Sequence, residues 1–160
     1  MNKGLNIKGN EIEFNKYSIG EIKFLFITKS FRIRFEEIKI VTISPRLSMD
    51  DEILIISLID KKGKFRQFSN YEFGKESITE FEKKLNLKSI RNIEWEKFSW
   101  EEHENFITDK VVYPSELYWE DLFVKPKGMK KTRIQILKFF SLKKSISGRF
   151  NPKIEEYLLD

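Results

Sequence analysis

Apolar and polar side chains alternate along much of the first half of the chain, as they do in half-buried β-strands. The clearest case is Phe31-Arg-Ile-Arg-Phe35, in which every second residue is apolar. Similar patterns predict strands at residues 5–8, 11–14, 21–28, 38–43 and 64–69, with turns at residues 9–10 and 60–63. We therefore expect consecutive antiparallel strands joined by tight turns.

The segment Ile53-Leu-Ile-Ile-Ser-Leu-Ile59 is apolar at every position except Ser57. A strand of this kind needs cover on both faces. One face would point into the interior of the sheet, and the other needs a helix, another segment or a partner. The strand before it is predicted to end at Pro45, because proline has no amide hydrogen to donate to a continuing ladder.

A helix is predicted over residues 77–85. Ser77 and Glu80 form a capping-box pattern, in which two side chains accept hydrogen bonds from free amides at a helix start. Ile78, Phe81 and Leu85 follow at spacings of three and four residues and form one apolar stripe. This arrangement is typical of an amphipathic helix with one buried face.

The strands and this helix follow a recognisable order: Phe31-Arg-Ile-Arg-Phe35-Glu-Glu-Ile38, the turn at residues 60–63, a strand ending near Phe68 and the capped helix. That order resembles the pleckstrin-homology-like superfold in its bacterial and GRAM-like versions, over about residues 5–88. The resemblance implies an α+β fold, with an antiparallel β-sheet or partly open β-barrel capped by a C-terminal amphipathic helix. Phosphoinositide-binding members carry a basic cluster in the first strand loop, where Lys16 stands alone here. The resemblance therefore implies the fold and not headgroup binding.

Beyond Lys88 the sequence predicts more helix. Ser99-Trp-Glu-Glu102 is a second capping-box pattern that opens a helix to about residue 107, and residues 113–122 suit a short helix. Residues 133–142 suit a strand or a helix, and residues 154–159 suit a last helical turn. We therefore divide the chain into a β domain with its helix at residues 1–88 and an α-rich elaboration at residues 89–160, packed on it within one globule.

Length and composition limit the class of protein. At 160 residues the chain is long enough for one domain with its own core. It has no cysteine, which excludes disulfides, thiol nucleophiles and thiolate metal sites and suits a reducing compartment. The N-terminus lacks the apolar run of a secretory signal, and no apolar segment approaches the roughly 20 residues that span a bilayer. We expect a cytoplasmic protein.

Catalytic and metal-binding patterns are missing from the sequence. The single histidine, His103, lies among glutamates on a predicted helix whose successive carboxylates do not converge on one point. No nucleophile motif, phosphate-binding loop or dinucleotide-binding glycine pattern is present. We therefore expect no enzyme, no cofactor and no small-molecule substrate.

Aromatic residues gather in an acidic segment. Residues 92–121 contain nine acidic residues and two basic ones, Lys97 and Lys110. Tryptophan and tyrosine are favoured at protein interfaces, so this segment is a candidate protein-binding surface. The alternative, which we favour, is that the aromatic residues cover the outer face of residues 53–59. The candidates are Trp95, Trp100, Tyr113, Tyr118 and Trp119.

The next segment has the opposite charge. Residues 122–160 contain ten basic residues, and their only acids are Glu155, Glu156 and Asp160. Such a segment can bind an anionic membrane surface, or it can be an ordered segment whose lysines simply point into water. Nucleic acid is the weaker partner, since no reading motif accompanies the charge. The candidate anion- or lipid-binding residues are Lys125, Lys127, Lys130, Lys131, Arg133, Lys143 and Lys144.

Two functional hypotheses follow. The first is a non-enzymatic protein-binding module, such as an immunity-type protein that neutralises a cognate toxin. A sheet edge and a groove beside the helix are the surfaces that such a fold offers to a partner. The second is a peripheral membrane module that binds anionic lipid through the basic C-terminal segment.

Overall fold

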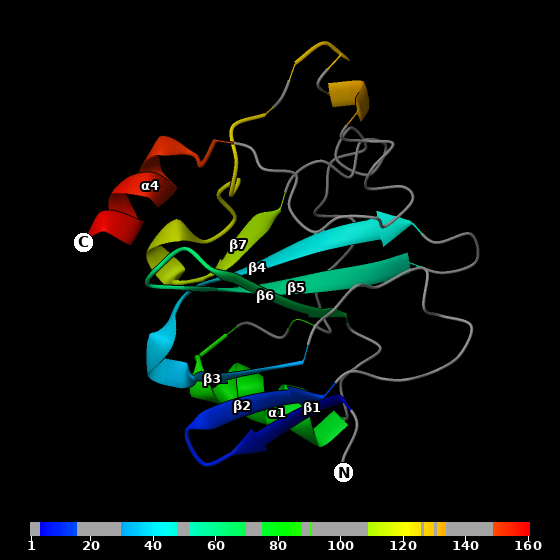
Figure 1. The fold of residues 1–160 in the computed structure, drawn as a ribbon, viewed down its shortest axis with the longest axis vertical. Helices are drawn as coiled ribbons and strands as arrows, with labels where there is room; N and C mark the ends of the chain where they lie inside the picture. The colour runs from blue at the N-terminus through cyan, green and yellow to red at the C-terminus, as the bar shows by residue number, and fades with distance from the viewer. Residues whose placement is uncertain are drawn as a thin grey trace.

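The computed structural model describes residues 4–15, 30–47, 52–69, 75–87, 90, 109–125, 127–129, 131–133 and 149–160. They form an α+β fold of two antiparallel sheets, with one helix after the sixth strand and another at the C-terminal end (Figure 1). The elements are β1 (Gly4–Lys8), β2 (Glu11–Asn15), β3 (Phe31–Arg34), η2 (Phe35–Glu37), β4 (Ile38–Leu47), β5 (Glu52–Asp60), β6 (Phe65–Ser69), α1 (Lys75–Lys84), β7 (Lys110–Tyr113), η6 (Ser115–Leu117) and α4 (Pro152–Leu159).

The strands belong to two separately hydrogen-bonded sheets. The first sheet has the order β1-β2-β3, and the second has the order β6-β5-β4-β7. All neighbouring strands are antiparallel, so the predicted α+β class is confirmed. The strands predicted at residues 5–8, 11–14, 31–35, 38–43, 53–59 and 64–69 are also confirmed. The strand predicted at residues 21–28 lies outside the described residues.

The first core lies where the inner faces of the two sheets meet α1. Phe68 of β6 is fully buried there, with its ring centroid 6.1 Å from that of Phe14 and 6.2 Å from that of Phe31, both in the first sheet. The ring of Phe81 in α1 meets Phe68 edge-on at 6.2 Å. Aromatic rings from both sheets and the helix therefore share one contact point, a geometry that stabilises beyond the area they bury.

The second core covers the opposite face of the four-stranded sheet. Ile40 of β4 and Ile59 of β5 pack there with Leu117, Leu122 and Ile154, and none of the five is more than 7% exposed. The prediction that β5 is covered on both faces is therefore confirmed, and at Ile59 the cover comes from residues beyond Lys88. Ile154 lies on α4, so the end of the chain is packed onto the sheet.

Backbone pairing extends this sheet beyond β7. Residues 120–122 run back along β7, with hydrogen bonds from Val111 N to Glu120 O (2.9 Å) and from Leu122 N to Asp109 O (2.8 Å). Phe123 then forms an isolated antiparallel bridge with Phe150. The rings of Phe123 and Phe150 stack on Phe65 of β6, at centroid distances of 6.2 and 6.3 Å. The outer layer is thus held at the far edge of the sheet as well as at β7.

A row of polar side chains interrupts this outer face. Thr42, Ser57 and Gln67 are in register across β4, β5 and β6, and all three are buried. Gln67 Nε2 donates a hydrogen bond of 2.7 Å to Ser57 Oγ, whereas Thr42 Oγ1 has no hydrogen-bond partner among the described residues. A one-residue shift in the strand pairing would point these polar side chains toward the first core. The row therefore favours a single register.

Three details differ from the sequence predictions. The strand β4 continues through Pro45, which pairs with Leu54, to Leu47. Since β7 pairs with β4 only as far as Ile43, β4 is an edge strand beyond that point and tolerates proline. The helix α1 begins at Lys75, so Ser77 lies inside it and is not its cap. Packing of the buried stripe, and not the capping pattern, fixes the position of this helix.

The third difference is in the segment that follows Asp109. Residues 113–122, predicted as a helix, contain only the short η6. The residues before η6 form β7 and those after it pair back along β7. The β-branched pair Val111 and Val112 favours a strand, and both are buried in it, one in each core. The helix predicted at residues 99–107 lies outside the described residues, as do residues 134–142.

The predicted helical turn near the end of the chain is confirmed as α4. Pro152 occupies its first turn, where the missing amide hydrogen has no intrahelical partner to lose. The side chain of Asn151 caps the helix by accepting a hydrogen bond of 3.2 Å from Lys153 N. No helix among the described residues is long and apolar enough to cross a membrane.

Asp60 fixes the turn between β5 and β6. Its Oδ1 accepts hydrogen bonds from the amides of Lys62 (2.8 Å) and Lys64 (3.0 Å), and its Oδ2 accepts one of 2.8 Å from Arg66 Nη1. Gly63 supplies a φ of 70°, which favours glycine. Burial alone would raise the pKa of Asp60, but the hydrogen bonds from Arg66, Lys64 and Lys62 outweigh burial and hold that pKa below its usual value.

Ile154→Ala should lower the free energy of unfolding by about 2–4 kcal/mol, because it leaves a cavity between α4 and the sheet. Denaturant unfolding measures this loss. Leu159→Ala is the matched control, since Leu159 lies on the same helix but is 85% exposed, and should change stability by less than about 0.5 kcal/mol. Equal effects of the two substitutions would contradict the packing of α4 onto β5.

Asp60→Asn should lower stability by about 1–3 kcal/mol at neutral pH, through weaker hydrogen bonds to Arg66 and the turn amides. The contribution of a carboxylate with a lowered pKa is complete above its unfolded pKa of about 4 and is lost as the pH falls through its folded pKa. The difference between Asp60→Asn and the parent should therefore shrink as unfolding is measured at lower pH. Asp160→Asn, at an exposed residue, is the control, and a pH-independent difference would show that charge is not the cause.

Candidate protein-binding surface

The candidate surface is carried by a hairpin formed by residues 109–122. Its two arms are β7 and residues 120–122, and its loop contains Pro114 and η6. Val111 donates to Glu120 O, and Trp119 N donates a hydrogen bond of 2.7 Å to Val111 O. Two backbone hydrogen bonds therefore join the two ends of the loop. They hold the loop against the edge of the second sheet.

Tyr118 and Trp119 are adjacent at the end of the loop. Both are half-buried, and their ring centroids lie 5.7 Å apart with the planes tilted by 39°. Trp119 has a φ of 69°, in the left-handed region that bulky residues rarely adopt. A glycine would take this conformation without steric cost, whereas tryptophan adopts it here against its backbone preference.

Both aromatic residues pack against the first core, and so does Tyr113. Leu117, only one residue before Tyr118, packs instead into the second core. The loop therefore folds around the edge of the sheet and contacts both layers. The exposed part of the Tyr118–Trp119 pair lies on a segment that is fixed by packing on two sides.

Tyr157 of the C-terminal helix lies near the hairpin loop. Burial raises the pKa of Tyr157, and the nearby Glu116 carboxylate and Tyr113 raise it further. Lys39 Nζ lies 5.2 Å from the centroid of the Tyr157 ring, a distance typical of a cation–π contact. Lys39 is the extra residue of an irregularity in the β4–β5 pairing, between Ile38 and Ile40. Such bulges redirect side chains, and this one accompanies the contact between Lys39 and α4.

Charged side chains hold the hairpin at its base. Lys110 is only 6% exposed, and its Nζ lies 2.8 Å from Asp121 Oδ1 across the hairpin. Lys125 contacts the other oxygen of Asp121 at 3.8 Å but is itself exposed. Glu120 forms an ion pair with Lys153 at the start of α4. The Lys110–Asp121 ion pair is a constraint on the hairpin, because losing Asp121 would remove a charged partner from a buried ammonium group.

The structure brings three of the five predicted aromatic residues together. Tyr113, Tyr118 and Trp119 belong to one hairpin, whereas Trp95 and Trp100 lie outside the described residues. The favoured prediction is that these aromatic residues cover the outer face of β5. Among the described residues, Leu117, Leu122 and Ile154 pack on that face, whereas Tyr113, Tyr118 and Trp119 pack against the first core.

The basic candidates lie beyond the hairpin. Lys125, Lys127 and Arg133 are exposed and Lys131 is half-buried. Lys130, Lys143 and Lys144 lie outside the described residues. The described basic residues therefore follow directly on the hairpin that carries the aromatic pair.

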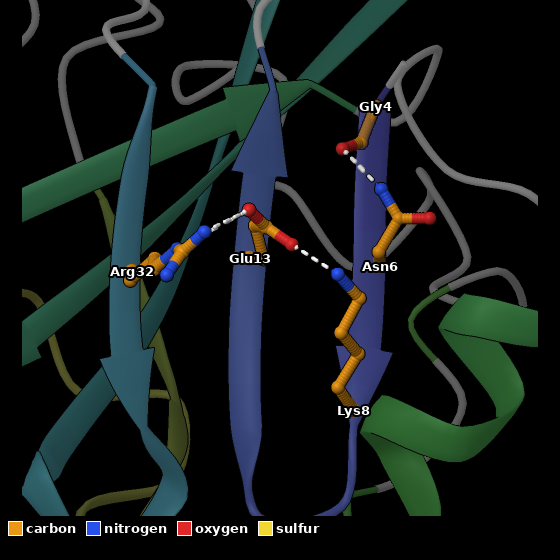
Figure 2. A network of polar contacts seen from close by, with 5 residues as sticks. All are labelled: Gly4, Asn6, Lys8, Glu13 and Arg32. Carbon is orange, nitrogen blue, oxygen red and sulfur yellow. Dashed lines mark hydrogen bonds and ion pairs between the residues drawn. The ribbon is translucent and has the colours of Figure 1, made fainter. Parts of the chain in front are cut away.

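A second polar cluster, on the outer face of the first sheet, is internally satisfied. Glu13 is 7% exposed and accepts hydrogen bonds of 2.7 Å from Lys8 Nζ and 2.7 Å from Arg32 Nη2 (Figure 2). The hydrogen bonds from Lys8 and Arg32 lower the pKa of Glu13. Because each carboxylate oxygen already has a cationic partner, Glu13 is poorly suited to act as a general base. Among the described residues, no three His, Cys, Asp or Glu side chains are grouped so that they could hold a metal ion.

Sequence reasoning missed Lys39, Glu116 and Tyr157 as neighbours of the candidate surface. The contact between Lys39 and Tyr157 joins the first and last parts of the chain, and depends on a pairing irregularity that no local pattern reveals. Glu116 could have been identified, since it lies within the acidic segment beside Tyr118. Comparison of the chain with family models, with curated proteins and with solved structures found no match.

Asp121→Asn should destabilise the protein by about 2–4 kcal/mol, because it removes the carboxylate that forms an ion pair with the buried Lys110 ammonium. Lys125→Gln removes an exposed partner of the same carboxylate and should cost less than about 0.5 kcal/mol. Denaturant unfolding of both variants at equal ionic strength makes the comparison. Indistinguishable stabilities would show that the Lys110–Asp121 contact contributes nothing to holding the hairpin.

Proposed function

We propose that this chain is a non-enzymatic protein-binding module that binds its partner through Tyr118 and Trp119. The observation that carries the proposal is the half-buried ring pair, with Trp119 held at a φ of 69° on a hairpin fixed to both cores. Tryptophan and tyrosine dominate the binding energy of many protein interfaces. Strained backbone of this kind costs about 1–3 kcal/mol and persists where the surrounding structure enforces it.

Pre-organisation strengthens the proposal. A binding side chain that is already fixed in the free protein loses little conformational entropy on association. The hydrogen bond from Trp119 N to Val111 O and the packing of Leu117 fix the loop before any partner arrives. The two rings would therefore meet a partner in nearly their final positions.

The charges around the pair indicate the chemistry of the partner. Glu116 is exposed two residues before Tyr118, and the sequence before and within the hairpin is acidic. A partner with lysine or arginine at its rim would be attracted and correctly oriented by these charges. We propose an immunity-type role, in which the chain occludes a basic surface of a cognate toxin. The modest size of the chain and the absence of catalytic motifs in its sequence support this choice.

We also propose that residues 5–88 form a pleckstrin-homology-like unit. The supporting observations are the consecutive antiparallel strands β1 to β6 and the amphipathic helix α1 that follows them. In the described residues these strands are divided between two sheets, and β7 joins the second sheet from beyond the helix. The proposed binding surface therefore lies on an addition to this unit, not within it.

The test is co-purification with the product of the neighbouring gene, followed by titration with the purified partner. A stable one-to-one complex and protection of cells that express the toxin are the expected results. Trp119→Ala should weaken the complex by about thirty-fold or more, as expected when an aromatic hot spot is truncated. Leu159→Ala removes an apolar side chain that is also exposed, on α4, and should leave affinity unchanged.

Glu116→Lys separates binding from folding, because Glu116 is exposed and packs in neither core. It should slow association with a basic partner and lower affinity by about ten-fold, through repulsion at the rim. Thermal unfolding should be nearly unchanged in this variant. The proposal fails if the neighbouring product does not bind, or if Trp119→Ala and Glu116→Lys both bind as tightly as the parent.

A further inference from the structure

Residues 124–125, 127–129 and 131–133 belong to a basic segment, called the basic loop below, in which residues 129 and 131–133 are helical. An apolar side chain is exposed at the turn where these helical residues begin, which we call its tip. Met129 is 91% exposed, and Val124, where the loop begins, is 47% exposed. A single exposed apolar residue is common on protein surfaces and needs no explanation. What distinguishes Met129 is the charge around it.

The cations of this loop are largely uncompensated. Lys127 and Arg133 are exposed on either side of Met129, and Lys125 is exposed near its base. Their only ion pair among the described residues is the contact of 3.8 Å between Lys125 and Asp121. The sequence contains no acidic residue between Asp121 and Glu155. The loop therefore presents positive charge and one apolar side chain together.

The base of the loop is fixed to the fold. Val124 N donates a hydrogen bond of 2.9 Å to Arg149 O, directly beside the Phe123–Phe150 bridge. At the tip, Gly128 has a φ of 61°, and its carbonyl accepts hydrogen bonds from Lys131 N (2.9 Å) and Thr132 N (3.4 Å) at the start of the helical residues. Residues 127–129 and 131–133 (orange) lie at the top of the view in Figure 1, well beyond β4 and β7. None of the described loop residues belongs to either core, so docking at the tip requires no change in the cores.

We propose that this loop docks onto an anionic phospholipid bilayer, with Met129 inserted among the headgroups and Lys127 and Arg133 against lipid phosphates. Basic residues next to an anionic leaflet and an apolar side chain at the boundary are the two forces that hold peripheral proteins on membranes. Lysine and arginine also place their charge at headgroup level while their aliphatic stems lie alongside apolar material. The loop lies outside residues 5–88 and makes no use of the Tyr118–Trp119 surface.

The apolar tip favours a membrane over a nucleic acid. A phosphate backbone would be bound by the same cations, and bases would be bound by stacking on aromatic rings. The described residues of the loop contain no aromatic side chain, and Met129 at its tip would gain little from a phosphate backbone. Insertion into a bilayer is the setting that uses both features of the loop.

The experiment is sedimentation of the full chain with vesicles of phosphatidylcholine alone or with about 30% phosphatidylglycerol, at ionic strengths from about 0.1 M to 0.5 M. Binding should require the anionic lipid and weaken with salt. Lys127→Gln with Arg133→Gln should lower the partition coefficient by about twenty-fold, since each cation near the surface contributes about five-fold. Met129→Ser should lower it by about five-fold, because burial of the thioether side chain is lost.

Two matched controls come from the same chain. Lys61→Gln with Lys62→Gln removes two exposed cations from the β5–β6 turn, where no apolar side chain is exposed, and Leu159→Ser removes an exposed apolar residue from α4. Both should change partitioning less than two-fold. Equal binding to neutral vesicles, or equal losses in loop and control variants, would overturn the proposal. The proposal would also be overturned if the chain bound single-stranded DNA with similar affinity and Met129→Ser left that affinity unchanged. The loop would then recognise phosphate alone.

Discussion

The four-stranded sheet carries apolar side chains on both of its faces, and the rest of the structure depends on covering them. In β5, Leu54, Ile56 and Leu58 point into the first core, while Ile59 points into the second. The first sheet and α1 cover one face, and the opposite face is covered by residues 109–125 and 149–160 where the structure describes them. A strand of this composition exposed on one side would leave several large apolar side chains in water. The C-terminal residues are therefore part of the folded core.

This constraint also fixes the position of the candidate binding surface. The hairpin of residues 109–122 supplies Val111, Leu117 and Leu122 to the outer layer, and its loop must then return around the sheet edge toward the first core. Tyr118 and Trp119 lie at that return. The unusual backbone at Trp119 is compatible with the fold because packing on both sides of the loop enforces it. The chain continues from this hairpin into the basic loop. The hairpin therefore positions both the Tyr118–Trp119 surface and the basic loop, which carry opposite charge.

Much of the fold could be predicted from local sequence. Alternation at residues 31–35 predicted a strand and which of its side chains face inward. The apolar run of β5 indicated that both of its faces would be buried. Turn chemistry at Asp60 and Gly63 identified the β5–β6 hairpin, since an aspartate and a positive-φ glycine carry their own geometry. These features depend on neighbours within a few residues, which is why a pattern along the chain reveals them.

Features that depend on distant partners could not be predicted. The strand β7 is four residues long, and its pairing with β4 joins residues about 70 positions apart, so the local pattern predicts no strand at residues 110–113. The continuation of β4 through Pro45 depends on where β7 ends, and the contact of Lys39 with Tyr157 depends on a bulge. For the candidate surface, the aromatic residue types were found from sequence, but their grouping and the backbone of Trp119 required the three-dimensional arrangement.

Hydrogen exchange of the full chain tests most directly whether the hairpin and the two-faced sheet form one cooperative unit. The amides to compare are those of Val111, Leu122 and Asn151, which donate within the outer layer, and those in the centre of β5. One unit predicts that both groups exchange at similarly slow rates and lose protection together in denaturant. Exchange about a hundred-fold faster in the outer layer, with β5 still protected, would show that the sheet folds without this cover and would contradict the account.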